Sequence, residues 1–100
     1  MTPPYVAVVF TSVRTSGDNG YGATAQRMDE LAAQQPGYIG IESARNADGF
    51  GITVSYWRDE DTARDWKRVA EHEEAQRRGR EEWYESYTVR IATVTREYGR

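Results

Sequence analysis

The chain of 100 residues contains no cysteine, which excludes disulfide bridges, thiolate nucleophiles and thiolate metal sites. Its one histidine, His72, excludes a metal site built from several histidines of one chain. No apolar run approaches the roughly 20 residues that a membrane-spanning helix needs, and no charged-then-apolar leader opens the sequence. The 13 basic and 16 acidic residues give a net charge of -3, which offers no basic surface for nucleic acid. These absences predict a soluble, cytoplasmic protein that binds neither nucleic acid nor a membrane.

Leucine is almost absent as well. The chain has one leucine, against eight valines and four isoleucines. Leu, Ile, Val and Phe together make up 15 of the 100 residues, a fraction low enough to raise the question of disorder. The charge is nearly balanced, however, and three tryptophans and seven tyrosines supply large apolar surfaces. The sequence therefore predicts a folded core of β-branched and aromatic side chains, a composition that favours sheet.

Hydrophobic periodicity and turn residues divide the first part of the chain into four elements. Residues 5–14 predict a strand, and a helix over 21–35 follows the breaker cluster that contains the candidate caps Asp18 and Asn19. Pro36-Gly37 ends this helix. Two further strands are expected over 38–45 and 50–57, joined by a turn as in a hairpin.

The rest of the chain predicts a second helix and a last strand. The helix opens at residues 58–61, where acidic side chains suit the positive end of the helix dipole. Its apolar pattern weakens near His72, so a bend or restart is expected before Gly79. Residues 83–98 predict a strand that is long or bulged, because its apolar phase slips between Ile91 and Val94.

The order of elements is β-α-β-β-α-β, with residues 1–4 as a short tail. This order is typical of the ferredoxin-like, split βαβ arrangement of the α+β class, in which two helices cover one face of an antiparallel four-stranded sheet. No linker or low-complexity segment interrupts the pattern. We expect a single domain over residues 1–100.

Both faces of the predicted sheet are apolar. In the first strand Val6, Val8 and Phe10 point one way, and Tyr5, Ala7, Val9 and Val13 point the other way. Two helices cover only one side, and a bare apolar face of several hundred square ångströms is larger than monomers usually expose. We therefore expect a homodimer in which two sheets close face to face into a barrel. The alternative is a monomer whose second face is only lightly buried.

Several runs along the chain resemble the antibiotic biosynthesis monooxygenase family, which belongs to the dimeric α+β barrel proteins. The first runs are Tyr5–Arg14, Gln35–Ser43 and Gly51–Trp57. The later ones are Trp66–His72, Ala75-Gln76, Gly79-Arg80, Trp83-Tyr84 and Tyr87–Ile91. The resemblance covers nearly the whole chain. It implies the fold more firmly than the reaction, because many relatives have no known substrate and one fold hosts many functions.

The resemblance leaves three functions open, and with them the question of whether the chain is an enzyme. The first is a cofactor-independent oxygenase, without metal or flavin, of a flat apolar aromatic small molecule such as an anthrone or a quinol. The second is a haem-binding or haem-degrading protein with His72 as axial ligand and Trp66 near the porphyrin. The haem-degrading relatives carry an asparagine on the first strand, where this chain has Thr11 or Ser12. The third is a barrel that binds a small molecule without turnover.

The candidate catalytic residue is His72, the only side chain here whose ordinary pKa lies near neutral pH. On an ideal helix it lies about 120° away from Trp66, at the flank or the exposed side. It is therefore either a base in a cleft between helix and sheet or a surface histidine between Glu71 and Glu73.

The candidate substrate-binding residues are mainly aromatic. They are Trp57, Trp66, Trp83, Tyr84 and Tyr87, which either fill the core or line a pocket for a flat substrate. Arg90 lies within an apolar run of the last strand. It either points inward, paired with Glu42 or a ligand anion, or lies at a solvated edge or dimer rim.

Overall fold

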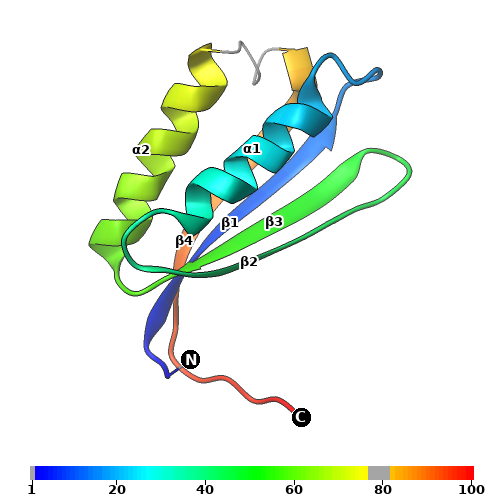
Figure 1. The fold of residues 1–100 in the computed structure, drawn as a ribbon. Helices are drawn as coiled ribbons and strands as arrows, with labels where there is room; N and C mark the ends of the chain where they lie inside the picture. The colour runs from blue at the N-terminus through cyan, green and yellow to red at the C-terminus, as the bar shows by residue number, and fades with distance from the viewer. Residues whose placement is uncertain (1, 77–81) are drawn as a thin grey trace.

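The computed structural model describes residues 2–76 and 82–100 of the chain. It contains the predicted elements in the predicted order (Figure 1). The strands are β1 (Tyr5–Arg14), β2 (Tyr38–Arg45), β3 (Phe50–Trp57) and β4 (Tyr84–Val94), and the helices are α1 (Tyr21–Ala33) and α2 (Glu60–Gln76). The strands form one antiparallel sheet in the order β2-β3-β1-β4. The ferredoxin-like α+β prediction is confirmed.

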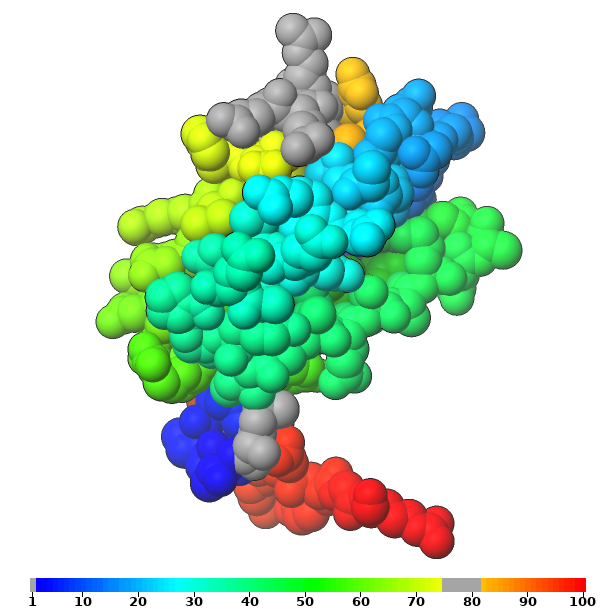
Figure 2. Space-filling view, viewed as in Figure 1, coloured from blue at the N-terminus to red at the C-terminus, as the bar shows by residue number. Residues whose placement is uncertain are grey.

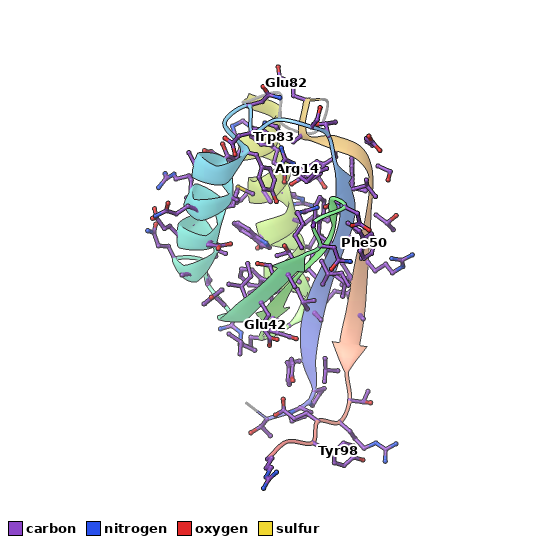
Figure 3. The ribbon with its side chains drawn as sticks, turned by 90° about the vertical axis from the view of Figure 1, so that its right-hand side faces the viewer. Arg14, Glu42, Phe50, Glu82, Trp83 and Tyr98 are labelled. Atoms are coloured by element: carbon purple, nitrogen blue, oxygen red, sulfur yellow. The ribbon has the colours of Figure 1, made fainter. Side chains whose placement is uncertain are left out.

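Both helices lie on one face of the sheet, as Figures 1 and 3 show from two directions. The register assigns Val6, Val8, Phe10 and Ser12 of β1 to this face, together with their partners Trp57, Ser55, Thr53 and Gly51 of β3. The core forms where the helices meet these strands. Its buried members are Val6, Val8, Ala32, Trp57, Ala63 and Trp66. β-Branched and aromatic side chains therefore form much of the core, as the composition indicates.

Local side-chain contacts set where each helix begins. The N-cap of α1 is Gly20, in the left-handed conformation, rather than Asp18 or Asn19. The Asp18 carboxylate, two residues earlier, accepts hydrogen bonds from the backbone N–H of Gly20 and Gly22, both at 3.1 Å. In α2 the Asp59 carboxylate accepts the N–H of Thr62 at 2.8 Å. The two helices are thus each preceded by an aspartate that neutralises free backbone donors.

The last strand differs from its prediction in two ways. It ends at Val94 because Val94 pairs with Tyr5, where β1 begins, so residues 95–98 have no strand to pair with. The pairing from Ile91 to Val94 is regular, and the expected slip there is wrong. The irregularity lies at the other end, where the partners of Val13 and Arg14 are Ser86 and Tyr84.

Helix α2 continues without a break through His72 to Gln76, so the predicted bend at this point is absent. The expected end before Gly79 lies outside the described residues, as do Gly79-Arg80 of the family motif. Figure 2 shows the helices covering their face of the molecule and the C-terminal residues extending away from its body. Within the described ranges, no helix is both long and apolar enough to cross a bilayer.

Candidate functional site

A cavity of about 410 Å³ lies between the helices and the sheet. All six elements contribute to its wall. The described lining residues are Val8, Phe10, Tyr21, Thr24, Ala25, Met28, Asp29, Ile41, Ser43, Ala44, Arg45, Thr53, Ser55, Trp66, Lys67, Ala70, Glu74, Trp83, Tyr84 and Val89. Its volume falls in the range of roughly 300–1,000 Å³ typical of small-molecule sites. The mixture of apolar walls with a few polar groups is also typical of such sites.

Three of the predicted aromatic residues line this cavity: Trp66, Trp83 and Tyr84. Trp66 is held by the indole of Trp57, stacked on it with ring centroids 5.7 Å apart. Trp83 is anchored at both ends of the residue. Its indole N–H donates to the Asn19 carbonyl at 2.8 Å, and its own carbonyl accepts the Arg14 Nε–H at 3.0 Å, which places the two residues together in Figure 3.

The other predicted aromatic residues lie outside the described lining. Trp57 is fully buried in the core, where its indole N–H donates to the Ser55 hydroxyl at 2.8 Å. Tyr87 lies on the helix face of β4, stacked on Phe10 at 5.7 Å, and is 43% exposed. Both therefore support residues that line the cavity, since Trp57 packs on Trp66 and Tyr87 packs on Phe10.

His72 is exposed on α2 and is absent from the described lining residues. Its role as a base stays a prediction. Arg90 is also exposed and lies on the opposite face of the sheet, since it pairs with Val9 rather than with a residue of the helix face. Of the two strand-one hydroxyls, Thr11 shares Arg90's face, whereas Ser12 is buried on the helix side.

The two carboxylates among the lining residues are Asp29 of α1 and Glu74 of α2. Asp29 is accessible to solvent and therefore lies at the mouth of the cavity. The protein removes part of the water around its carboxyl, and this desolvation raises the pKa of the group. Glu74 is 8% exposed and has an interaction of its own. Lys67, which also lines the cavity, is paired with Glu71 at 2.5 Å. No group of three or more potential metal-ligating side chains occurs among the residues that the structure describes.

A polar cluster at one end of the cavity was missed by the sequence analysis. It consists of Arg45 of β2, Tyr21 of α1 and Tyr84 of β4. The guanidinium of Arg45 donates to the Tyr21 hydroxyl at 3.3 Å and to the Ser12 hydroxyl at 2.8 Å. Burial, with the neighbouring Tyr21 and Glu74, raises the pKa of the Tyr84 hydroxyl, which therefore stays protonated at neutral pH. The one signal in the sequence is Gly51, which pairs with Arg45 across the hairpin and leaves room for its side chain.

Comparison with known proteins places this architecture in a family. SnoaB, a cofactor-independent oxygenase from Streptomyces nogalater, has a similar structure, with a TM-score of 0.70 over 97% of each chain at 16% identity. Protein SO0527 from Shewanella oneidensis is similar with a TM-score of 0.74 over 93% of each chain at 13% identity. At such identities the likeness concerns the fold.

Sequence similarity is closer to an uncharacterized protein, YqjZ of Bacillus subtilis. The two are 56% identical over 95 residues, which cover 95% of this chain and 83% of YqjZ. The family model described as antibiotic biosynthesis monooxygenase matches residues 4–78. The chain therefore belongs to the antibiotic biosynthesis monooxygenase family, as the resemblance of its strand and helix motifs indicates.

Proposed function

We propose that the chain is a cofactor-independent oxygenase of a flat aromatic substrate, such as an anthrone or a quinol, bound between the helices and the sheet. The observation that carries the proposal is the cavity of about 410 Å³ with Trp66, Trp83 and Tyr84 in its wall. Indole and phenol faces bind flat aromatic rings by stacking and by apolar contact. The likeness in fold to SnoaB, itself a cofactor-independent oxygenase, supports the same class of reaction.

The chemistry needs a base, an apolar cavity and dioxygen. For an anthrone, the base takes a proton from the CH₂ group opposite the carbonyl, which leaves an anion delocalised onto the carbonyl oxygen. The anion gives one electron to dioxygen, and the resulting carbon radical and superoxide combine to form a C–O bond. Proton return and cleavage of the O–O bond then release water and leave the quinone, so one oxygen atom enters the product and the other leaves as water. A site shielded from water favours the anion and the proton transfer.

We infer that Asp29 is the base. Asp29 is one of the residues that line the cavity, at its solvent-accessible mouth, and its raised pKa brings it closer to the operating pH, which strengthens a general base. His72 is the rival base from the sequence analysis. Asp29→Asn is expected to lower the turnover at least about 100-fold, the usual contribution of a positioned base, whereas His72→Ala is expected to retain it. A loss confined to His72→Ala would return the role to the histidine.

The test of the function is oxygen uptake with anthrone-type and hydroquinone substrates, followed by mass spectrometry of products formed under isotopically labelled dioxygen. We expect uptake above the uncatalysed rate and one labelled oxygen atom in the quinone from the anthrone. A matched pair of variants on α1 locates the reaction. Ala25→Phe fills the cavity and abolishes uptake, whereas Ala33→Phe, on an exposed residue of the same helix, does not. Ligand binding without uptake across several substrates would identify the chain as a binding barrel without turnover.

We also propose that the protein is a homodimer joined through the sheet face that the helices leave open. This face carries Ala7, Val9, Val13, Val54 and Tyr56, together with Phe50 and Ile52, which are 44% and 38% exposed. One row across it has opposite charges at its ends, because the register aligns Glu42, Val54, Val9 and Arg90. A two-fold axis parallel to the strands places β4 of one copy over β2 of the other. Each Arg90 then faces the partner's Glu42 across an apolar centre.

Light scattering at micromolar concentration tests this assembly. We expect a dimer for the wild-type chain, a weakened dimer for Arg90→Glu, and recovery in the double variant that also carries Glu42→Arg. Arg64→Glu, on the exposed surface of α2, is the control and leaves the dimer intact. A wild-type monomer, or a double variant as weak as the single one, would contradict the proposed interface.

A further inference from the structure

Glu74 interrupts the apolar stripe of α2. Ala63, Trp66 and Ala70 recur at intervals of three and four residues, and all three belong to the core or pack against it. Helical spacing gives the next place on this stripe to Glu74, four residues after Ala70. The structure confirms this placement, because Glu74 is 8% exposed and is one of the residues that line the cavity. A carboxylate therefore occupies a position where the pattern calls for an apolar side chain.

The buried carboxylate of Glu74 has capacity for a ligand. Burial of an ionised carboxylate is costly unless hydrogen bonds or opposite charges satisfy it. Glu74 has an interaction of its own. The two oxygens of a carboxylate together accept about four hydrogen bonds, so an interaction within the protein and a hydrogen bond from a ligand are compatible.

The neighbouring donors are directed at acceptors within the protein. The Arg45 guanidinium donates four hydrogen bonds to uncharged oxygens, one of them to the Tyr21 hydroxyl at 3.3 Å. Burial is the largest cause of the raised pKa of Tyr84, and its hydrogen bond with Tyr21 raises this pKa further, which makes Tyr84 the donor in that bond. These hydrogen bonds leave Glu74 as the charged acceptor that a ligand meets at this end of the cavity.

Two opposite charges act at this end. Beyond the larger effects of burial and of Tyr21, the charge of Glu74 raises the pKa of the Tyr84 hydroxyl and the charge of Arg45 lowers it. An anionic ligand therefore meets the Glu74 carboxylate, and a cationic ligand meets the Arg45 guanidinium. A neutral ligand that donates a hydrogen bond meets no like charge and satisfies the buried carboxylate.

We propose that Glu74 is a specificity-determining residue that accepts a hydrogen bond from a hydroxyl group of the ligand. The ligand class is then the neutral, hydroxylated aromatic compounds. This inference rests on the proposed function, because it orients the substrate in the same cavity. The hydroxyl end lies inward at buried Glu74, and the carbon that loses its proton lies toward Asp29 at the mouth. Because like charges repel most strongly at short range, this orientation separates the anion formed in the reaction from the buried carboxylate.

Three naphthalene probes test this specificity. 2-Naphthol carries a neutral hydroxyl group, 2-fluoronaphthalene carries a small fluorine that donates no hydrogen bond, and 2-naphthoate carries a carboxylate. Equilibrium dialysis at neutral pH measures the affinity of each probe for the protein. A buried charged group that loses its hydrogen bond changes affinity about tenfold or more. We therefore expect the wild-type chain to bind naphthol at least about tenfold more tightly than either of the other two probes.

Three variants assign the specificity to Glu74. Glu74→Gln keeps the shape of the side chain without its charge, and is expected to reduce the preference for naphthol over fluoronaphthalene and to bring naphthoate close to naphthol. Glu74→Asp keeps the charge but withdraws it by one methylene, so naphthol is expected to bind more weakly while naphthoate stays disfavoured. Glu60→Gln, on an exposed glutamate in the first turn of the same helix, is the matched control and keeps the wild-type ranking. Thermal melting verifies that each variant is folded.

Fluoronaphthalene or naphthoate binding as tightly as naphthol to the wild-type chain would overturn the role of Glu74. A ranking that Glu74→Gln leaves unchanged would overturn it as well, because the preference would then come from another group. Where Glu74→Gln does not fold, Glu74→Asp decides the question, because it retains the charge.

The oxygen-uptake assay separates this inference from the proposed function. Uptake with an anthrone together with equal binding of the three probes removes only the role of Glu74. Selectivity for naphthol without uptake on any substrate removes only the oxygenase. If no probe binds and no uptake occurs, both proposals fail.

Discussion

Gly37 controls how closely α2 approaches the sheet, and its replacement by alanine is expected to be unusually destabilising. Its φ of 81° lies in the left-handed region, which costs an alanine about 1–2 kcal/mol. A Cβ atom there would also lie 2.5–2.7 Å from three side-chain atoms of Thr62. Thr62 is buried and hydrogen-bonded to Asp59, so it has little room to move. Overpacking of this kind adds about 1–3 kcal/mol.

Gly20 provides a matched control, because its φ of 84° is nearly the same and no atom lies within 4 Å of the position of its Cβ. Gly20→Ala therefore carries the backbone strain without the collision. We expect the free energy of unfolding of Gly37→Ala to fall below that of Gly20→Ala by about 2 kcal/mol, which corresponds to about 8–16 °C in Tm for a domain of this size.

Denaturant and thermal melts at one protein concentration measure this difference. The fixed concentration matters because association raises apparent stability. Equal losses of unfolding free energy in the two variants would show that Thr62 moves aside without an energetic penalty. That result would refute the close packing of α2 against the loop before β2. That packing also sets the cavity, since α2 carries Trp66 and Glu74 into its wall.

Three further predictions concern single side chains. Because burial raises the pKa of Asp29, its carboxylate lowers stability above that pKa; Asp29→Asn should melt higher than wild type at pH 7, a gain that disappears in acid. The hydrogen bonds from Thr62 lower the pKa of Asp59, so the Asp59 carboxylate should stabilise the fold at neutral pH, and this stabilisation should be lost as the pH falls through the lowered pKa. The denaturation midpoint should therefore fall with decreasing pH in the wild-type chain, and Asp59→Asn should remove this contribution to the pH dependence. Ser55→Ala should lower the free energy of unfolding by about 1–3 kcal/mol because it leaves the buried Trp57 N–H without its acceptor. Introduced into Trp57→Phe, which lacks that N–H, Ser55→Ala should cost less than it costs in the wild-type chain. An equal or larger cost in the Trp57→Phe background would contradict this cause.

The fold was accessible from the sequence because its signals are local. The run of β-branched and aromatic residues in β1, the Pro36-Gly37 break and the hairpin turn each act over a few residues, and their order leaves one familiar topology. The aromatic wall was partly accessible for the same reason, since scarce aliphatics require that tryptophans fill the interior. The predicted end of the last strand at residue 98 was wrong because a strand needs a pairing partner, which is distant in sequence. β4 ends at Val94 because its partner β1 begins at Tyr5.

The sequence by itself determined the β-α-β-β-α-β order, the acidic start of the second helix and two apolar sheet faces, because period and turn chemistry act between neighbours in the chain. Only the tertiary structure decided which groups meet. It places His72 outward and Arg90 on the open face, and it joins Arg45, Tyr21 and Tyr84 from three separate elements at one end of the cavity. Strand register and helix placement determine such contacts between distant residues. Register and placement depend in turn on packing across the whole fold rather than on any local run of residues.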